Sequence, residues 1–473
     1  MIKYLCKNTH RYFLKNNLWR CGVKIVVIGD GKVGKAIVEH ICQEDHDVVI
    51  IDNNPNVIEQ MVNRYDVMGI CGNGANYEIQ KSAHTDKADI VVAATASDEI
   101  NILSCFVARQ LGAKSTIARV RNYDYNSQIE LMKKDLGITM TINPEAEASN
   151  EIMNIVNFPE AIRVDSFGDG NVDLIELYIP ESSPLIGKSL SSIHTEYKVK
   201  ILVCAVQRDE EVFIPTGSFT FHAKDKIHIT ASRDMIKIFL NKLGLIETKI
   251  KNVLIIGGGK ITIYLAEALL KSRYNVKIIE KEYDHCVYLS TILPNATIIH
   301  GDGSDQNILK EEGIDDTDAL ICLTGSDEEN IIISMYAYKE KVKKIITKVN
   351  TPSFASLLET IGVASVISPK EITSSKIIRY VRSSANKHGS NILTLYKLVN
   401  NRVEAVEFLA KENSRVLNIP LKDIKLKQKI LITSIIRNNE VIIPSGMDYI
   451  MANDRVIVVT DGQYLDDLND ILE

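Results

Sequence analysis

Short runs of apolar residues alternate, along much of the chain, with longer segments that carry apolar residues at helical spacing. The run at 24–28 is followed by a glycine-rich turn, a helix-patterned segment at 36–41 and a second apolar run at 47–51. Strands that alternate with helices pack into a parallel sheet covered by helices. The pattern therefore predicts an α/β, Rossmann-like domain at the start of this region.

The same alternation continues as far as residue 143. We expect helices at 56–65 and 99–111, and strands at 90–94, 115–120 and 138–142. After Asn143-Pro144 the pattern changes. A helix at 145–157 is followed by short alternating strands at 174–179, 201–206 and 226–229, separated by turns rich in Pro, Gly and Asp. This predicts a small α+β domain of about 85 residues, a common domain size.

The chain then repeats itself. Gly29 and Asp52 recur 228 positions later as Gly257 and Glu280, and a series of later residues recurs after 229 positions: Asn101 as Asn330, Arg208 as Arg437, Pro215 as Pro444 and Asp225 as Asp454. So constant a spacing indicates duplication of a two-domain unit. We therefore expect a basic leader at 1–22, Rossmann-like domains at 23–145 and 249–370, and small α+β domains at 146–248 and 371–473.

The strongest chemical signal is the glycine turn after the first strand. In a dinucleotide fold the first glycine makes a tight turn, the second lets backbone approach a pyrophosphate, and the third lets the helix pack close. The free N–H groups at the start of the helix then face the phosphates. An acid at the end of the second strand accepts hydrogen bonds from a ribose. The candidate residues in the first half are Gly29, Asp30, Gly31, Lys32, Val33, Gly34 and Asp52.

The second half offers an equivalent set, namely Gly257, Gly258, Gly259, Lys260, Ile261 and Glu280. The alternative is a glycine turn that only packs. A further loop, Thr95-Ala96, follows a buried strand, and ligands of open α/β sheets bind at the edge where such strands end. Here the alternative is a helix N-terminus stabilised by Asp98. Arg119 ends the next strand, where it could bind phosphate or pair with a carboxylate.

Other chemistry is not indicated. The net charge of -6 argues against a general nucleic-acid binder. The eight cysteines form no CxxC pair, and the ten histidines have no metal-binding spacing. Gly187-Lys188-Ser189 lacks the earlier glycine of a P-loop and reads as a turn that opens a helix. No apolar run approaches the ~18 residues of a membrane helix, and no catalytic signature is recognisable.

Residues 1–22 contain basic residues and no acid. They read as a disordered or wrongly assigned leader, or alternatively as a basic amphipathic segment on a membrane surface.

Together, the glycine turn at 29–34, Asp52, the stretch 95–99 and Arg119 resemble the RCK (KTN) domain family, which regulates potassium conductance. The stretches 183–189 and 214–217, with Arg208, resemble its C-terminal companion. The resemblance implies NAD(H) or ATP/ADP bound at the sheet edge and no catalysis. It also implies a cytoplasmic homo-oligomer, expected to be a tetramer, that is peripheral on the inner face of the plasma membrane through an integral-membrane potassium transporter of the Trk type.

This sequence departs from the RCK pattern in its second half. Thr262 stands where glycine is usual, and Lys348 aligns with Arg119. We expect the β-branched Thr262 to push the following helix outward. We therefore expect the first half, which also has Arg119 in place of Lys348, to be the tighter NAD(H) site. Two other classes stay open: an NAD-dependent dehydrogenase whose small domains hold substrate, and a nucleotide sensor with a partner outside transport.

Overall fold

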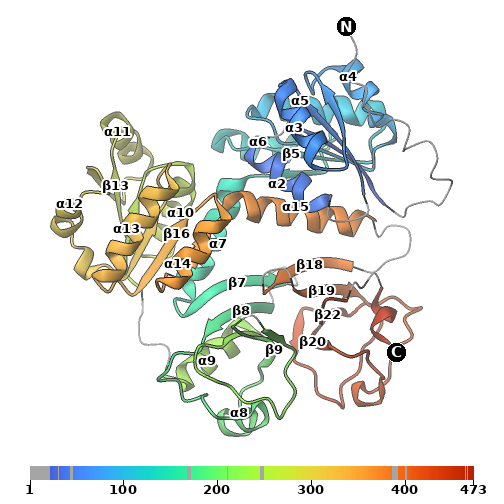
Figure 1. Ribbon diagram of the computed structural model, residues 1–473, viewed down its shortest axis with the longest axis vertical. Helices are drawn as coiled ribbons and strands as arrows, with labels where there is room; N and C mark the ends of the chain where they lie inside the picture. Colours follow the sequence, from blue (N-terminus) through green and yellow to red (C-terminus); the bar gives the residue numbers. More distant parts are fainter. Residues whose placement is uncertain are drawn as a thin grey trace. The chain divides into compact units, whose positions relative to one another are not determined.

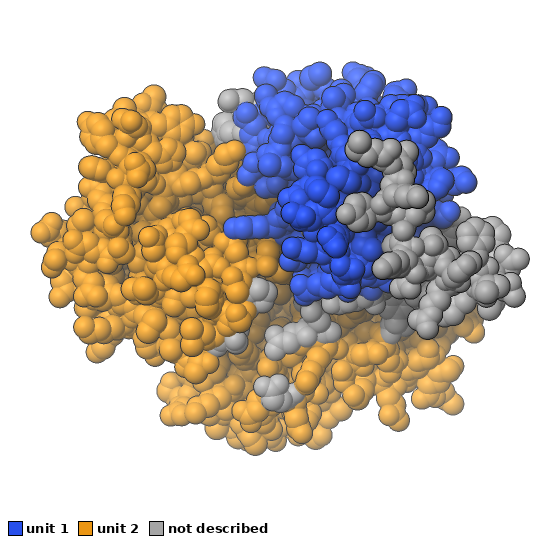
Figure 2. Space-filling view, turned by 45° about the horizontal axis from the view of Figure 1, so that its top comes forward, with its two compact units in different colours: residues 1–142 blue, residues 143–473 orange. Residues whose placement is uncertain are grey.

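The computed structural model describes residues 22–29, 31–42, 46–167, 172–209, 211–244, 250–363, 365–385, 392–399, 402–463, 465 and 467–473. The expected leader, apart from Gly22, and the candidate residue Asp30 lie outside this part of the chain. The chain divides into two compact units, residues 1–142 and 143–473, which Figure 2 shows in different colours. No helix among the described residues combines the length and apolarity that crossing a bilayer requires.

The first unit is built on a six-stranded parallel sheet in the order β3-β2-β1-β4-β5-β6, the strand order of a dinucleotide-binding fold. The strands β1, β2 and β4 are nearly continuous apolar runs because helices cover both faces of such a sheet. Its strands are β1 (Lys24–Ile28), β2 (Asp47–Asp52), β3 (Met68–Cys71), β4 (Ile90–Ala93), β5 (Ser115–Arg119) and β6 (Met140–Ile142). Its helices are α2 (Lys32–Ile41), α3 (Pro55–Arg64), α4 (Tyr77–Ser82), α5 (Asp98–Leu111) and α6 (Tyr123–Met132).

The second unit contains a sheet of the same topology, β14-β13-β12-β15-β16-β17. Its strands are β12 (Asn252–Ile256), β13 (Asn275–Glu280), β14 (Thr297–His300), β15 (Ala319–Cys322), β16 (Lys344–Lys348) and β17 (Ser365–Ile367). Its helices are α10 (Lys260–Lys271), α11 (Tyr283–Ile292), α12 (Gln306–Glu311), α13 (Asp327–Lys339) and α14 (Pro352–Thr360). Each element matches one in the first unit, which confirms the predicted tandem Rossmann-like fold.

The helix that follows the first sheet packs against the second one. Helix α7 (Pro144–Asn157) lies against α10 and crosses α15 (Pro369–Ala385), as Figure 1 shows. Its buried face, including Ile152 and Ile155, belongs to the same apolar cluster as Leu265 on α10. Two hydrogen bonds fix this packing: Asn143 Nδ2 donates to Tyr264 Oη at 2.9 Å, and Tyr274 Oη donates to Asn157 Oδ1 at 3.1 Å.

Two antiparallel sheets complete the second unit, in the orders β10-β9-β11-β8-β7 and β18-β19-β22-β20-β21. The first contains β7 (Ala161–Phe167), β8 (Val172–Tyr178), β9 (Leu202–Arg208), β10 (Glu211–Phe213) and β11 (Lys226–Ala231), with α8 (Leu190–Tyr197) and α9 (Arg233–Lys242). The second contains β18 (Ile392–Leu398), β19 (Val403–Leu409), β20 (Ile430–Arg437), β21 (Glu440–Ile442) and β22 (Arg455–Asp461), with short 3₁₀ turns at 421–423 and 468–471. The expected small α+β domains are thus present, and the sequence pattern missed β7 and β10.

The two small sheets share a core. Phe167, Leu174 and Ala205 of the first sheet belong to one apolar cluster with Val403 and Val459 of the second. Burial of this shared surface removes apolar area from water and holds the two small sheets together within the unit.

Candidate functional site

The first glycine turn is shaped by Gly29. This residue has a φ of 90°, and its N–H donates to the Ile51 carbonyl at 2.8 Å. A Cβ at this position would lie 2.8 Å from the Thr95 Cα. Both the backbone conformation and the space therefore require glycine, so the turn from β1 to α2 forms as the motif predicts.

Helix α2 begins close to the glycine turn and without a side-chain cap. A Cβ at Gly34 would lie 2.0 Å from the Gly29 carbonyl oxygen, so glycine lets the helix pack against the turn. Gly31 is the N-cap residue and provides no side-chain cap, and Lys32 and Val33 form the first turn. The unpaired N–H groups and positive dipole end of such a turn attract phosphate.

Asp52 lies beside this turn because β2 pairs in parallel with β1 and both strands end at the same edge. Its Oδ1 accepts a hydrogen bond from the Asn54 N–H at 2.8 Å. A carboxylate at this place is the group that the motif predicts for accepting hydrogen bonds from a ribose. The fold thus brings together the phosphate-binding and ribose-binding elements that the motif predicts.

The loop at Thr95-Ala96 is held by its own neighbours. The Thr95 hydroxyl donates to Asn101 Oδ1 at 2.7 Å, and Asn101 Nδ2 donates to the Arg119 carbonyl at 2.9 Å. The Arg119 guanidinium donates to the Thr95 carbonyl at 3.1 Å. Thr95 and Arg119 therefore lie together at the sheet edge, where Arg119 supports the loop through the Thr95 carbonyl. Ala96 is exposed beside them.

The N-terminus of α5 lies directly after this loop, with Asp98 in its first turn, as the alternative interpretation expects. Ser97 is the N-cap residue, and its hydroxyl accepts from the Ile100 N–H at 3.2 Å. Asp98 is buried, and its Oδ2 accepts from the N–H groups of Arg121 and Asn122 at 2.8 and 2.7 Å. Asp98 thus fixes the chain that follows β5.

The second glycine turn has the same backbone but a different set of supporting side chains. Gly257 has a φ of 93° and donates to the Ile279 carbonyl at 2.8 Å. Glu280 Oε2 accepts from the Gly258 N–H at 2.7 Å, and His285 Nε2 lies 2.8 Å from the Gly258 carbonyl oxygen. Because a carbonyl can only accept, Nε2 carries the hydrogen. The peptide groups around Gly258 are thus held on both sides by Glu280 and His285.

Thr262 takes the place of Gly34 at the second turn. Its side chain is fully buried, and its hydroxyl donates to the Gly257 carbonyl at 2.5 Å. Gly259 is the N-cap residue, and α10 begins at Lys260 and Ile261, as α2 begins at the equivalent Lys32. The hydroxyl thus forms a hydrogen bond that glycine cannot form. The expected outward displacement of the helix stays a prediction, and it is supported by Gly34, where a Cβ would lie 2.0 Å from the Gly29 carbonyl oxygen.

Lys348 also behaves more like Arg119 than expected. Its ammonium donates to the Thr324 carbonyl, just as Arg119 donates to the equivalent Thr95 carbonyl. Asn330 Nδ2 donates to the Lys348 carbonyl at 3.0 Å, which repeats the role of Asn101. The two halves therefore support this loop in the same way.

Two kinds of residue at these loops were not predicted from the sequence. Asn101 and Asn330 recur 229 positions apart, and this preserved spacing is a signal that the sequence does contain. His285 could not have been found, because its contact with Gly258 joins residues 27 positions apart that only the fold brings together.

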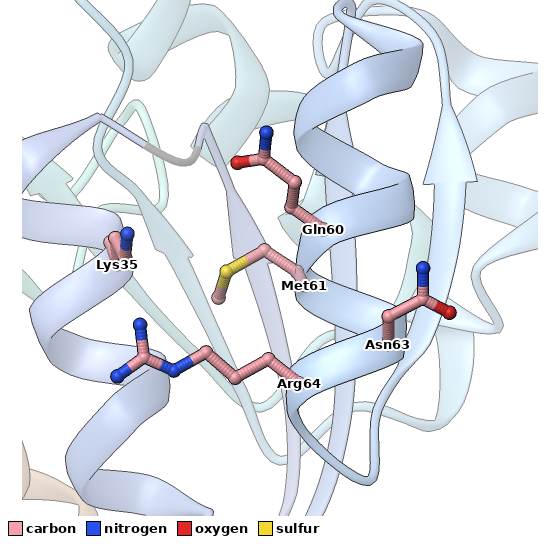
Figure 3. Close-up of a pocket in the computed structure, with 5 residues that line it drawn as sticks. All are labelled: Lys35, Gln60, Met61, Asn63 and Arg64. Carbon is pink, nitrogen blue, oxygen red and sulfur yellow. The ribbon is translucent and has the colours of Figure 1, made fainter.

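A pocket of about 380 Å³ lies elsewhere, between α2 and α3 on the outer face of the first sheet. It is lined by Lys35, Gln60, Met61, Asn63 and Arg64, as Figure 3 shows. None of the predicted site residues lines it. We therefore place the candidate site at the sheet edge and not in this pocket.

Comparison with family models agrees with this arrangement. The TrkA-N domain model matches residues 25–144 and 253–369. The TrkA-C domain model matches residues 174–244 and 405–473. The two domain types alternate twice, in the order that the internal repeat predicts.

Relatives match along nearly the whole chain. A Trk system potassium uptake protein TrkA homolog 1 from Methanosarcina mazei is 32% identical over 444 residues, which covers 92% of this chain and 97% of the relative. Among solved structures, the GsuK RCK domain superposes with a TM-score of 0.60 at 15% identity over 93% of this chain and 92% of that one. The GsuK channel bound to NAD gives a TM-score of 0.61 at 16% identity, covering 93% and 77%. With its repeated domain pairs and its full-length relatives, this chain belongs to the TrkA family of Trk system potassium uptake proteins.

Proposed function

We propose that this chain is the cytosolic, nucleotide-binding regulatory subunit of a potassium uptake transporter. The observation that carries the proposal is the edge of the first sheet, where an uncapped helix N-terminus and the Asp52 carboxylate lie together. This pair suits a pyrophosphate and a ribose. The role is one of binding and regulation, without catalysis.

The proposed ligand is NAD(H), with ATP or ADP as a second candidate. In the first half, Gly31, Lys32 and Val33 would present backbone N–H groups to the phosphates, and Asp52 would accept from the ribose. Gly29 and Gly34 would shape the turn, and Thr95, Ala96 and Arg119 would border the ligand. Asp30, which lies outside the described residues, would complete the loop. In the second half Gly257, Gly258, Gly259, Lys260, Ile261 and Glu280 would act in the same way.

We expect the first half to be the tighter NAD(H) site. Lys348 and Arg119 contact equivalent carbonyls, so the difference does not rest mainly on them. It rests on Glu280, whose two oxygens already accept from the Gly258 and Glu282 N–H groups at 2.7 and 2.9 Å. A ribose would therefore compete with the loop for Glu280.

Regulation would follow from linkage. A nucleotide shifts an equilibrium between two shapes only by binding one shape better than the other. Helix α7 packs against α10, which follows the second glycine turn, and then leads into β7 of the first small sheet. A change at the second turn would thus reach the small sheets through α7.

The chain would act as a homo-oligomer, most simply a tetramer, attached to an integral-membrane potassium transporter of the Trk type at the inner face of the plasma membrane. Apolar side chains are exposed at matching places in both halves. These are Leu103 and Phe106 on α5 and, 229 positions later, Ile332 and Met335 on α13. A strip that is exposed twice in one chain suits an assembly in which both halves make equivalent contacts.

Calorimetric titration with NADH tests the nucleotide part of this proposal. Asp52→Ala should remove the high-affinity phase, whereas Glu280→Ala, its matched control, should spare it. Loss of one hydrogen bond to a charged group corresponds to about ten- to a hundredfold in affinity. The opposite pattern would mean that the halves are assigned the wrong way round. Co-purification with membrane proteins from native cells would test the transporter partner.

A further inference from the structure

The pocket between α2 and α3 combines an apolar floor with cationic side chains. Lys35 extends from α2, and Met61 and Arg64 extend from α3 into the space between the two helices, as Figure 3 shows. Met61 is only 2% exposed, so it provides the floor. The side-chain amides of Gln60 and Asn63 complete the lining. All four polar side chains can donate hydrogen bonds, and a volume of about 380 Å³ admits a small molecule.

The second half has aliphatic side chains at the equivalent place. The residues 228 positions after Lys35 and Arg64 are Ile263 and Ile292. Both isoleucines pack against the apolar cluster that contains Leu265. The repeat has therefore kept the two helices while the first half carries a cation on each of them, at a place where the second half needs only packing.

Both cations are available to a ligand. Across the part of the chain that the structure describes, the Lys35 ammonium has no hydrogen-bond or ion-pair partner. Arg64 Nη2 lies 3.3 Å from Glu39 Oε1, and 58% of the Arg64 side chain remains exposed. An ion pair so exposed contributes little to stability. An incoming anion can therefore replace Glu39 as the partner of Arg64.

The charge and the donor geometry of the pocket suit a phosphate group. Glu39 follows Lys35 by four positions on α2, so these two side chains share one face of the helix. The two cations Lys35 and Arg64 exceed the single Glu39 carboxylate by one positive charge. A guanidinium binds phosphate through two parallel N–H groups, and an ammonium adds a compact positive charge. The apolar floor is suited to the carbon atoms of the same ligand.

From this arrangement we infer that the pocket binds a small organic phosphate, with the phosphate between Lys35 and Arg64 and the carbon atoms over Met61. The site is separate from the nucleotide site, because no residue of the glycine turn lines the pocket. The phosphate belongs either to a soluble molecule or to a phospholipid headgroup, since both present the same charged group. The inference does not depend on the proposed nucleotide-binding function.

The test is calorimetric titration of the full chain with glycerol 3-phosphate, with NADH present at saturation to occupy the nucleotide sites. Lys35→Ala and Arg64→Gln should each weaken binding about ten- to a hundredfold, the range for loss of one hydrogen bond to a charged group. Glu39→Gln should strengthen binding, because it removes the carboxylate that competes for Arg64. Glycerol, which has no phosphate, should not bind.

Lys81→Ala is the matched control, because Lys81 is an exposed lysine on α4 that does not line the pocket. It should leave the affinity for glycerol 3-phosphate unchanged, and thermal melting confirms that each variant is folded.

A second arm of the experiment identifies the source of the phosphate. It measures co-sedimentation of the chain with phosphatidylglycerol vesicles. Co-sedimentation that is lost in the Lys35→Ala and Arg64→Gln chains, without binding of glycerol 3-phosphate, would assign the pocket to a lipid headgroup. Binding of glycerol 3-phosphate without co-sedimentation would assign it to a soluble organic phosphate.

The inference is overturned if the chain binds neither glycerol 3-phosphate nor the vesicles, or if binding is unchanged in both the Lys35→Ala and Arg64→Gln chains. Weaker binding by the Glu39→Gln chain than by the wild type would also overturn it, because the carboxylate would then support the ligand. A chain that binds glycerol 3-phosphate through Lys35 and Arg64 but binds no NADH would overturn the proposed function alone.

Discussion

Some glycines of the glycine turns are required by the fold, whereas others are not. Gly29 and Gly34 are needed by the fold itself, because a Cβ at either position would lie within 3 Å of neighbouring backbone atoms. Gly31 differs, since its φ of -68° is ordinary and a Cβ there would meet no atom within 4 Å. The fold therefore sets no requirement for glycine at this position, and we propose that the requirement comes from backbone approach to a pyrophosphate.

Gly31→Ala should consequently leave stability almost unchanged and weaken NADH binding by at least tenfold. The added methyl group would occupy space that the phosphates need. The measurement is a thermal melt combined with an NADH titration. Gly259→Ala is the matched control, because its Cβ also meets nothing within 4 Å, and it should spare the tight NADH phase. A Gly31→Ala chain with wild-type NADH affinity would contradict our placement of the pyrophosphate.

At the scale of elements, the junction between the second nucleotide domain and the first small sheet is closely fitted. Lys344, the first residue of β16, is buried, and its ammonium donates to the Ala161 carbonyl at 2.6 Å. Ser365 on β17 donates to the neighbouring Ile162 carbonyl at 3.2 Å. The second sheet thus holds the start of β7 as well as helix α7. This buried lysine makes the junction sensitive to pH.

Burial lowers the pKa of Lys344 to about 7, an effect that Glu160 partly opposes. The unfolded chain, with a lysine pKa of about 10.4, therefore binds more protons between pH 7 and 10, so stability should rise with pH across this window. The substitution Lys344→Met should abolish this rise in the free energy of unfolding, which is up to about 1.4 kcal/mol per pH unit. Relative to the wild type, the melting temperature of the Lys344→Met variant should be highest near pH 7. This difference between the two melting temperatures should shrink toward pH 10.

Lys343→Met is the matched control for this prediction, because Lys343 is half exposed and pairs with Asp318 at 3.0 Å. Its melting temperature should follow the wild-type pH dependence. A Lys344→Met chain whose melting temperature differs from that of the wild type by a constant amount at every pH would show that Lys344 is not titrating in this window.

For the molecule as a whole, duplication has preserved fine detail. Arg208 forms a two-bond pair with Asp225 at 2.7 and 2.8 Å, and Arg437 forms the same pair with Asp454 at 2.9 and 2.8 Å. A paired and hydrogen-bonded arginine can remain at a mostly buried carboxylate without a large desolvation cost. The two small domains are therefore copies in their polar interactions as well as in their strand order.

The exposed strips on α5 and α13 lead to a prediction about assembly. Ile332→Glu places a charge in the apolar strip of the second half, and light scattering should show a mass well below that of the wild-type oligomer, because burying an unpaired charge is costly. Ile238→Glu is the matched control on α9, where another apolar side chain is exposed, and it should leave the mass unchanged. An unchanged mass for Ile332→Glu would exclude α13 from the interface.

The sequence by itself determined the repeated α/β and α+β architecture and the position of both glycine turns. It could do so because apolar periodicity, glycine conformation and residue spacing are local properties of the chain. It missed β7 and β10, and it did not indicate the hydrogen bond of the Thr262 hydroxyl, which depends on a carbonyl five residues earlier in a folded turn.

Only the tertiary structure decided which distant elements meet. Helix α7 follows the first sheet in the chain but packs against the second, because its apolar face fits the cluster around Leu265. The edge-to-face contact of the Tyr283 and His300 rings and the contact of His285 with Gly258 likewise join residues that are separate in sequence. Such contacts arise from strand order and helix packing, which a periodic pattern does not specify, so the distinct chemistry of the second site became visible only in the folded chain.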